Sequence, residues 1–354
     1  MNDLYIISPN EEIGSTLENM IKYSTKGIEV KHIDKVSKDT NFKNKKLLFV
    51  AKASNIGYDI PIIDFLWTLY KEDPNAFEGS TGAVFVSSVD EEGTKRLAQD
   101  IIYIANNMGC AFIGHPLVEA ASSFKNFLTW QKTLDMSLEE ICYTLSERLI
   151  QRLLKDKALK ISKGNILVLY SMPHSTSNTL DLWHMVANKI SNFEIKEIQI
   201  ESGKIIDCKG CPYTVCRHFG KSNGCFYGGG VMTEDVLPAI EEADAVVWLC
   251  PNYNDALSAN LTAVINRITA LYRRITFYNK SIFAVIVSGN SGSDSVARQV
   301  IGALNINKGF RLPPYFSIRT IANDPKVIFS VENIEKRSEA FAENLMKNIS
   351  REEV

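Results

Sequence analysis

The sequence predicts an α/β protein made of two tandem units, each with a buried parallel sheet and helices packed against it. Short, fully apolar runs of the kind found in buried parallel strands recur along the 354 residues. Each run is followed by an amphipathic segment of helix length, so strands and helices alternate. The same order of elements occurs twice, which indicates that one unit is a copy of the other.

Three pairs of matching segments relate the two halves. KLLFVAKASN corresponds to AVVWLCPNYN, and GAVFVSSVD corresponds to FAVIVSGNSG. In the third pair, YIISPNEEIGSTLENMI and LVLYSMPHSTSNTLDLW, a strand leads through a polar loop into a helix start. A helical stretch runs from about Met136 to Lys155, and we expect the linker to follow at Asp156–Gly164. The predicted domains are therefore 1–155 and 164–354.

The spacing of the matches locates an insertion in the second half. Thr16 pairs with Thr179 at an offset of 163 residues, whereas Leu47 pairs with Val246 at an offset of 199. The difference between 199 and 163 is 36, so the second copy has 36 extra residues between its first helix and its central strand. Four cysteines lie there, in an insertion that we place at 205–230. Because the first copy lacks this insertion, the cysteines are not explained by a role in the fold that both copies have.

Composition and charge argue against several classes of partner. The chain has 39 basic and 41 acidic residues, for a net charge of −2, and neither sign forms a long block. We therefore expect neither nucleic acid nor an anionic membrane surface as a partner. The opening MNDLYIISPN does not resemble a secretory signal, and no run of about 18 apolar residues occurs. We expect a reducing cytoplasm, where crowded thiols indicate metal binding or redox activity sooner than disulfides.

The polar loop after the first strand of the second half suits an anion. It lies between a strand and a helix, where backbone N–H groups and the helix dipole favour negative charge. Its polar residues include Ser175, Ser177, Asn178 and Thr179. A phosphate monoester would fit this loop, although plain N-capping by Ser177 or Asn178 explains the same residues. The equivalent loop of the first half has Glu11 and Glu12, which would repel a phosphate.

Three segments of the second half together resemble a known family. YSMPHSTSNT, CPNYNDALSANLTAVINR and SGNSGSD follow successive strands. In that order they resemble the FMN-binding loops of the NADPH-dependent FMN reductase and iron-sulfur flavoprotein group of the flavodoxin-like superfamily. The resemblance covers Gly164 to about Thr320, and in the first half it extends to the fold alone. It implies two tandem flavodoxin-like doubly wound parallel sheets with helices on both faces, of which the first is a degenerate copy.

The resemblance also implies a role for each loop. The first loop would hold the FMN phosphate, the second would lie along the isoalloxazine ring, and the small residues of the third would let backbone approach the ring. The cofactor-binding residues are then His174, Ser175, Ser177, Asn178, Thr179, Pro251, Asn252, Tyr253, Asn254, Ser288, Gly289, Asn290, Ser291 and Gly292. Taken singly, PNYN is explained as a polar turn and SGNSG as a flexible loop. Three such loops on one sheet edge favour FMN, because ligands of open α/β sheets bind at the carboxyl ends of strands.

The four crowded cysteines have three interpretations. They are Cys208, Cys211, Cys216 and Cys225, spaced Cys-x2-Cys-x4-Cys-x8-Cys. This spacing resembles the compact motif that ligates a 4Fe-4S cluster in iron-sulfur flavoproteins. Tetrahedral zinc is a rival, although its common motifs pair two Cys-x2-Cys knuckles and one is present here. Free thiols near the flavin are the third interpretation. His218 could replace one ligand, but we expect it to be a surface histidine.

Several other residues of interest are expected to pack in the protein core and to have no role in a functional site. Cys110, Cys142 and Cys250 lie in apolar contexts and are expected in the core. Trp183 and His184 lie on a helix with recurring apolar residues, which favours core packing for both. A C-terminal helical face carries Ile334, Phe341, Leu345 and Ile349 and is expected to pack on its own domain. No Ser-His-Asp order or paired-carboxylate site is evident, so the catalytic residues are unknown.

The predicted function is that of an FMN-dependent oxidoreductase of the NAD(P)H-dependent FMN reductase type. A reduced nicotinamide or another donor would reduce FMN, and electrons would pass to an unidentified acceptor, in one version through an iron-sulfur cluster. The alternatives are a flavodoxin-like electron carrier or redox sensor without small-molecule turnover, and a zinc module that has lost flavin. We expect the first half to be a built-in partner of the second, a pseudo-dimer within the chain, which could also form a homo-oligomer.

Overall fold

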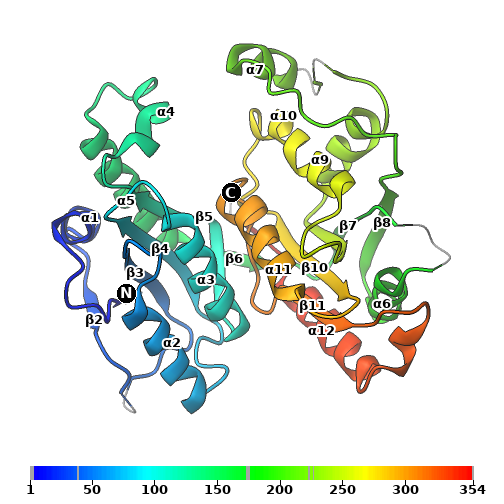
Figure 1. The fold of residues 1–354 in the computed structure, drawn as a ribbon, viewed down its shortest axis with the longest axis horizontal. Coiled ribbons are helices and arrows are strands. Elements are labelled where there is room, and N and C mark those ends of the chain that lie inside the picture. The colour runs from blue at the N-terminus through cyan, green and yellow to red at the C-terminus, as the bar shows by residue number, and fades with distance from the viewer. Residues whose placement is uncertain (1–3, 38–39, 173–175, 222–223, 226, 353–354) are drawn as a thin grey trace. The chain divides into compact units, whose positions relative to one another are not determined.

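The apolar runs of the sequence form two five-stranded parallel sheets, one in each of two units of the chain. The computed structural model describes residues 4–37, 40–172, 176–221, 224–225 and 227–352. The two compact units are Met1–Lys157 and Ala158–Val354 (Figure 1). Among the described helices, none is long and apolar enough to cross a bilayer.

The first unit alternates strands and helices as its sequence predicts. Its strands are β1 (Leu4–Ile7), β2 (Val30–Ile33), β3 (Lys46–Ala53), β4 (Thr81–Ser88) and β5 (Ala111–Ala120). Its helices are α1 (Ser15–Ser24), α2 (Ile60–Glu72), α3 (Thr94–Asn107), the 3₁₀ turn η1 (Lys125–Phe127), α4 (Leu128–Gln131) and α5 (Leu138–Lys155). The sheet order is β2-β1-β3-β4-β5, and the paired strands are parallel. This is the 2-1-3-4-5 order of flavodoxin-like sheets.

The second unit repeats this order. Its strands are β6 (Ala158–Lys160), β7 (Gly164–Tyr170), β8 (Phe193–Gln199), β9 (Ala245–Pro251), β10 (Ser281–Ser288), β11 (Ser317–Ile321) and β12 (Ser350–Glu352). Its helices are α6 (Asn178–Ala187), α7 (Tyr213–Lys221), α8 (Leu237–Glu242), α9 (Ala259–Arg267), α10 (Thr269–Tyr272), α11 (Ser293–Val300) and α12 (Ile334–Asn348), with η2 (Met232–Val236), η3 (Ile301–Ile306) and η4 (Val327–Ser330). The main sheet has the order β8-β7-β9-β10-β11 and is parallel. The predicted fold class is therefore confirmed.

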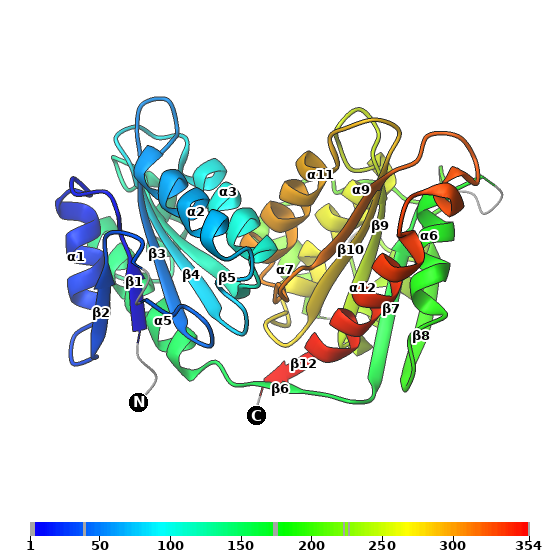
Figure 2. The same cartoon turned by 90° about the horizontal axis from the view of Figure 1, so that it is seen from below.

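Helices cover both faces of each sheet (Figure 2). In the first unit, Leu17 of α1 and Ile150 of α5 share a core cluster with Phe85 of β4. Every residue of β4 is buried, because the strand lies between two helix layers. The helix predicted from Met136 begins at Leu138, where Ser137 and Glu140 form a capping box.

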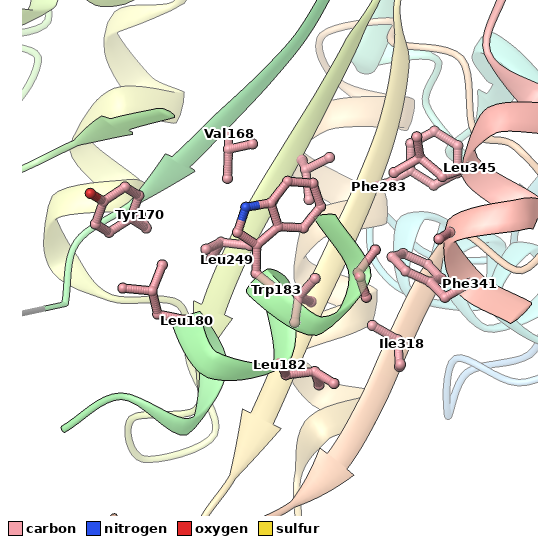
Figure 3. Close-up of a cluster of buried hydrophobic side chains, with 14 of the residues drawn as sticks. Val168, Tyr170, Leu180, Leu182, Trp183, Leu249, Phe283, Ile318, Phe341 and Leu345 are labelled. Carbon is pink, nitrogen blue, oxygen red and sulfur yellow. The ribbon is translucent and has the colours of Figure 1, made fainter. Parts of the chain in front are cut away.

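The core of the second unit gathers around Trp183 of α6 (Figure 3). Its side chain is fully buried among strand residues that include Leu249 and Phe283, and its indole Nε1 donates to Glu197 Oε1 at 2.7 Å. Phe341 and Leu345 of α12 pack into the same cluster. The C-terminal helix therefore packs on its own unit, as predicted.

One prediction about local structure is wrong. His184 was expected in the core, but its side chain is 48% exposed and its Nε2 lies 3.9 Å from Glu197 Oε2. Successive helical residues point about 100° apart, so the neighbour of a buried tryptophan can face solvent. The predicted linker Asp156–Gly164 contains the boundary between the two units, and it also contains the strand β6, which pairs antiparallel with β12. A linker strand of three residues has too short a pattern to be seen in the sequence.

The three cysteines expected in the core are buried as predicted: Cys110, Cys142 and Cys250. Burial raises the pKa of all three thiols, and that of Cys142 rises to about 12. These thiols are therefore protonated at neutral pH and serve as small apolar groups.

Candidate functional site

The three candidate flavin loops follow neighbouring strands of the second unit. The first loop comes after β7, the second after β9 and the third after β10, and these strands are adjacent in the parallel sheet. The chain direction across the sheet reverses between β7 and β9. Ligands of doubly wound sheets bind outside the carboxyl ends of the strands at such a reversal. The fold thus brings the predicted loops together at the expected edge.

In the first loop, Ser177 and Asn178 form side-chain hydrogen bonds within the protein. Ser177 caps α6, since its Oγ accepts from the Leu180 N–H at 3.2 Å. Thr179 is buried at 3% exposure. His174 and Ser175 lie outside the described residues. N-capping by Ser177, the simpler explanation from sequence, is therefore present, and a phosphate contact by this loop stays a prediction.

Asn178 ties the first loop to a distant segment. Its Nδ2 donates to the carbonyl oxygens of Ala322 and Asp324 at 3.1 and 2.8 Å. Its Oδ1 accepts from the Ile328 N–H at 3.3 Å, and the residue is buried. These bonds commit the amide to holding segment 322–328 against the start of α6. The sequence could not indicate this role, because the partners lie about 150 residues away.

Two serines that sequence reasoning missed connect the first loop to the second. The hydroxyl groups of Ser171 and Ser258 lie 2.8 Å apart. Ser258 also caps α9 by accepting from the Leu261 N–H at 3.4 Å. Its place just before a helical pattern is a signal that could have identified it as an N-cap, whereas nothing in the sequence marks Ser171.

Asn252 joins the second loop to the third. Its Nδ2 lies within hydrogen-bond distance of Asp255 Oδ1, Ser288 Oγ and the Ser291 carbonyl oxygen, at 3.1, 3.2 and 2.7 Å. Its Oδ1 is buried and has no hydrogen-bond partner among the described residues. Buried acceptors of proteins are normally satisfied. An unsatisfied acceptor beside these loops fits an N–H donor of a bound ligand such as a flavin ring.

Tyr253 is displayed by a tight turn in the second loop. Tyr253 and Ala256 exchange backbone hydrogen bonds, and the two residues between them, Asn254 and Asp255, have φ values of 54° and 58°. Two successive residues in the left-handed region define a turn of the type I′ kind. Tyr253 is 51% exposed and leaves an aromatic face open for stacking.

Glycine allows the second and third loops to touch. A Cβ on Gly292 would lie 1.7 Å from Asp255 Oδ1, and the residue has a φ of 86°. A Cβ on Gly289 would lie 2.9 Å from Asn323 Oδ1. Of the other predicted residues, Ser288 is buried, Asn290 and Ser291 are exposed, and Pro251 ends β9.

The four clustered cysteines line one cavity of about 220 Å³ in the second unit. Its described lining comprises Cys208, Cys211, Cys216, Cys225, Asp207, Lys209, Gly210, Tyr227, Asn266, Arg267, Thr269, Ala270 and Arg273. His218 is exposed, as predicted, and is not in this lining. No three described His, Cys, Asp or Glu side chains are close enough together to hold a metal ion. This finding bears equally on zinc and on a thiolate-ligated cluster, since both need several ligands around one centre.

Positive charge surrounds the cysteine cavity. Lys209, Arg267 and Arg273 line it, against the single carboxylate of Asp207. Lys308 lies next to it, and its Nζ donates to Thr269 Oγ1 at 2.7 Å. Burial and, to a smaller degree, Arg273 lower the pKa of Lys308, whereas Cys208 and Cys216 act in the opposite sense. These cations stabilise negative charge in the cavity.

The equivalent edge of the first unit is occupied by its own side chains. Lys52 Nζ donates to the Glu12 carbonyl oxygen at 3.0 Å, and Glu11 and Glu12 are exposed. Asn10 Nδ2 donates to the buried Asp59 at 3.2 Å. Residues of this loop are thus bonded within the chain, while its two glutamates stay exposed.

A 2-1-3-4-5 parallel sheet with polar loops at its switch point defines a flavodoxin-like domain. Residues 165–323 match the model of the NADPH-dependent FMN reductase family. The match lies within the second unit and confirms the predicted resemblance and the predicted class, an NAD(P)H-dependent oxidoreductase. It also supports FMN as the cofactor. No curated protein matches the sequence.

Several solved structures are distantly similar to the chain. A putative quinone reductase from Klebsiella pneumoniae is 14% identical, with a TM-score of 0.41, over 53% of this chain and 87% of that one. An FMN-dependent NADH-azoreductase from Bacillus anthracis, in complex with FMN, is 13% identical, with a TM-score of 0.37, over 51% and 99%. An NAD(P)H:quinone oxidoreductase from Methanothermobacter marburgensis is 11% identical, with a TM-score of 0.40, over 52% and 97%. Likenesses this weak identify neither a ligand nor a reaction.

Proposed function

We propose that the second unit binds FMN at the carboxyl edge of its sheet and passes electrons from NAD(P)H or another reduced donor to an acceptor. The observation that carries this proposal is the junction of the loops at Asn252, whose Oδ1 lacks a partner among the described residues. The family match over residues 165–323 supports FMN as cofactor and a reduced nicotinamide as donor.

The residues of this chain would hold and orient the cofactor. Backbone N–H groups at the start of α6 would bind the phosphate, because the helix dipole favours an anion there. Asn252 would fix the ring through its free oxygen, and Tyr253 would lie against it. FMN, when bound, supplies the transfer of a hydride or of single electrons. No general acid or base is assigned.

We further propose that Cys208, Cys211, Cys216 and Cys225 hold a 4Fe-4S cluster. The support is that all four thiols line one cavity, which is surrounded by cations that would offset the charge of an anionic cluster. Cys211→Ser should lower the iron content sharply and leave the flavin in place, because the segment is an insertion outside the main sheet. Unchanged iron would refute the assignment.

We also propose that the first unit is a degenerate copy that binds no FMN and serves the second as a built-in partner. Its candidate phosphate loop is closed by Lys52 and carries two exposed glutamates. Its helix α2 presents Ile60, Trp67 and Tyr70 to solvent at 65, 55 and 43% exposure. Exposed apolar residues on one helix are typical of an interaction surface.

Flavin and metal analysis of the anaerobically purified protein tests these proposals. We expect one FMN per chain, iron, and an absorbance band that bleaches on reduction. A clear value of two FMN per chain would contradict the degeneracy of the first unit. Asn252→Ala should weaken FMN retention, because it removes both the free acceptor and the loop junction. Asn348→Ala, on α12, is the matched control and should retain FMN.

Steady-state turnover of NAD(P)H distinguishes the proposed enzyme from the alternative function, an electron carrier or redox sensor. An enzyme of the proposed class oxidises NAD(P)H continuously with an added acceptor, whereas a carrier reduced by another protein does not. FMN binding without steady-state NAD(P)H oxidation would favour the carrier. A yellow protein without iron would retain the flavin proposal and remove the cluster.

A further inference from the structure

We propose that Arg267 is a positioning residue that closes the cysteine segment and supplies the counter-charge for an anionic occupant of its cavity. Arg267 is the last residue of α9 and is 5% exposed. Its Nη1 donates to the Ile206 carbonyl oxygen at 3.2 Å, and its Nη2 donates to the Tyr227 carbonyl oxygen at 2.8 Å. These carbonyls flank the segment that contains the four cysteines, so one guanidinium joins its two ends.

The charge of Arg267 lacks an acidic partner. Among the described residues, no carboxylate forms an ion pair with its guanidinium, although the side chain is buried. Isolated charges are costly to bury, and buried arginines are normally paired with anions. Arg267 lines the cavity that also contains the four thiols. We infer that an anionic occupant of this cavity, such as a thiolate-ligated cluster, is its partner.

Neighbouring residues fix the same segment to the same stretch of chain. Asn266 Nδ2 donates to Asp207 Oδ1 at 2.9 Å, and this oxygen also accepts from the Cys208 N–H at 2.6 Å. The Arg273 guanidinium lies 4.7 Å from the ring centroid of Tyr213 in α7. Residues 266–273 therefore form the base of the cysteine segment.

The base is also tied to the candidate flavin site through α9. This helix begins after Ser258, whose hydroxyl meets that of Ser171 in the first loop. Its nine residues span roughly 14 Å. Arg267 is at the other end, so replacing it should loosen the cysteine segment and leave the flavin loops intact. The identity of the occupant rests on the proposed cluster, whereas the closure does not.

The test compares Arg267→Met, Arg267→Lys and Arg298→Met in the full-length protein. Arg298 pairs with Asp294 within α11, away from the cysteine segment, and provides the control. The first readout is the rate at which iodoacetamide modifies Cys208, Cys211, Cys216 and Cys225 in chelator-treated protein, mapped by mass spectrometry. The second is iron content, and the third is bound FMN.

We expect Arg267→Met to raise the modification rates of the partly buried Cys211, Cys216 and Cys225 about tenfold or more, since both ends of the segment are released, whereas Cys208 is already exposed and should change little. Arg267→Lys keeps the charge but cannot bond both carbonyls as a fork, so the modification rate should rise in this variant too. Because the charge is kept, Arg267→Lys should retain more iron than Arg267→Met. Arg298→Met should match the wild type, and FMN should remain bound in all three.

Wild-type modification rates in both Arg267 variants would overturn the proposed closure. If Arg267→Met does not fold, Arg267→Lys decides, because it retains the buried charge. A wild-type protein without iron would refute the cluster, but the modification rates would still test the closure. If the wild type contains iron, equal iron in the Met and Lys variants would overturn the counter-charge role.

Discussion

Gly292 shows how a single missing side chain shapes the candidate flavin site. The second and third loops approach so closely there that a Cβ would overlap Asp255, which also accepts from Asn252. The sequence predicted small residues in this loop so that backbone could approach the ring. The structure adds that Gly292 is needed for contact between the loops themselves.

Gly292→Ala should therefore reduce FMN retention. The added methyl group forces Asp255 away and strains a backbone with φ of 86°. Flavin content after gel filtration measures the effect. Gly203→Ala has a similar φ of 79° but nothing within 4 Å of the added atom, so it separates backbone strain from loop contact. Equal loss of FMN in both variants would contradict this account.

Asn178→Ala should destabilise the second unit as well as the first loop. It removes the bonds to Ala322, Asp324 and Ile328 and leaves buried main-chain groups unsatisfied. The expected loss is roughly 1 to 3 kcal/mol. Thermal unfolding of the FMN-free protein measures it, and Ser177→Ala, which removes an N-cap, gives the comparison at about 1 kcal/mol. An unchanged melting temperature would show that segment 322–328 does not depend on Asn178.

At the level of elements, the sequence predicted what depends on local pattern. Strands such as β4 and β10 are buried along their whole length and have apolar centres because both faces are covered, so they stood out as buried strands. The insertion was found by the change of offset between the copies. The packing of the insertion on residues 266–273 could not be predicted from the sequence, because it depends on bonds such as that of Arg267 to the Tyr227 carbonyl, 40 residues away. The partners of Asn178 and the pairing of β6 were hidden for the same reason.

Helix α5 carries a tyrosine whose ionisation is coupled to folding. Tyr143 stacks on Tyr23 of α1 with ring centroids 4.7 Å apart, and its hydroxyl donates to Glu139 and accepts from Asn19. Burial and then Glu139 raise its pKa from 10.0 to about 12. The neutral phenol is therefore favoured in the folded state.

The stability of the first unit should consequently fall as the pH rises from 10 to about 12. Because the folded state holds the proton of Tyr143 more tightly than the unfolded state does, the neutral phenol stabilises the fold below about pH 10. This stabilisation is lost as the pH rises through the folded-state pKa. Between about pH 8 and pH 11, the melting temperature of the Tyr143→Phe variant should fall by less than that of the wild type. The buried Cys142 thiol, with a pKa raised to about 12, should cause part of the remaining loss. Tyr58→Phe removes an exposed phenol and should behave as the wild type.

At the level of the whole molecule, duplication was readable because both copies keep the same order of strands and helices. The flavodoxin-like fold class followed from the resemblance, and the 2-1-3-4-5 order of both sheets confirms it. What the first unit does for the second stays a proposal. Its exposed α2 residues are a reason to test the two units apart.

Expression of residues 158–354 tests the built-in partner. The fragment begins at β6, because this strand pairs with β12 of the same unit. If the first unit is a partner, the fragment should expose apolar surface, self-associate and retain FMN more weakly than the full chain. Light scattering and flavin titration measure these properties. A soluble monomer with full FMN affinity would show that the first unit takes no part in the flavin site.

The pairing of β6 with β12 also constrains the order of events during synthesis. Residues 158–160 leave the ribosome before any strand of the main sheet of the second unit. Their partners at 350–352 leave it after all the strands of that sheet and the helices that cover it. Domains generally fold as units, with the N-terminal one first. The first unit can therefore complete its sheet while the connection behind it is still unpaired. The connection becomes fixed last, once the second unit has been translated to its final strand.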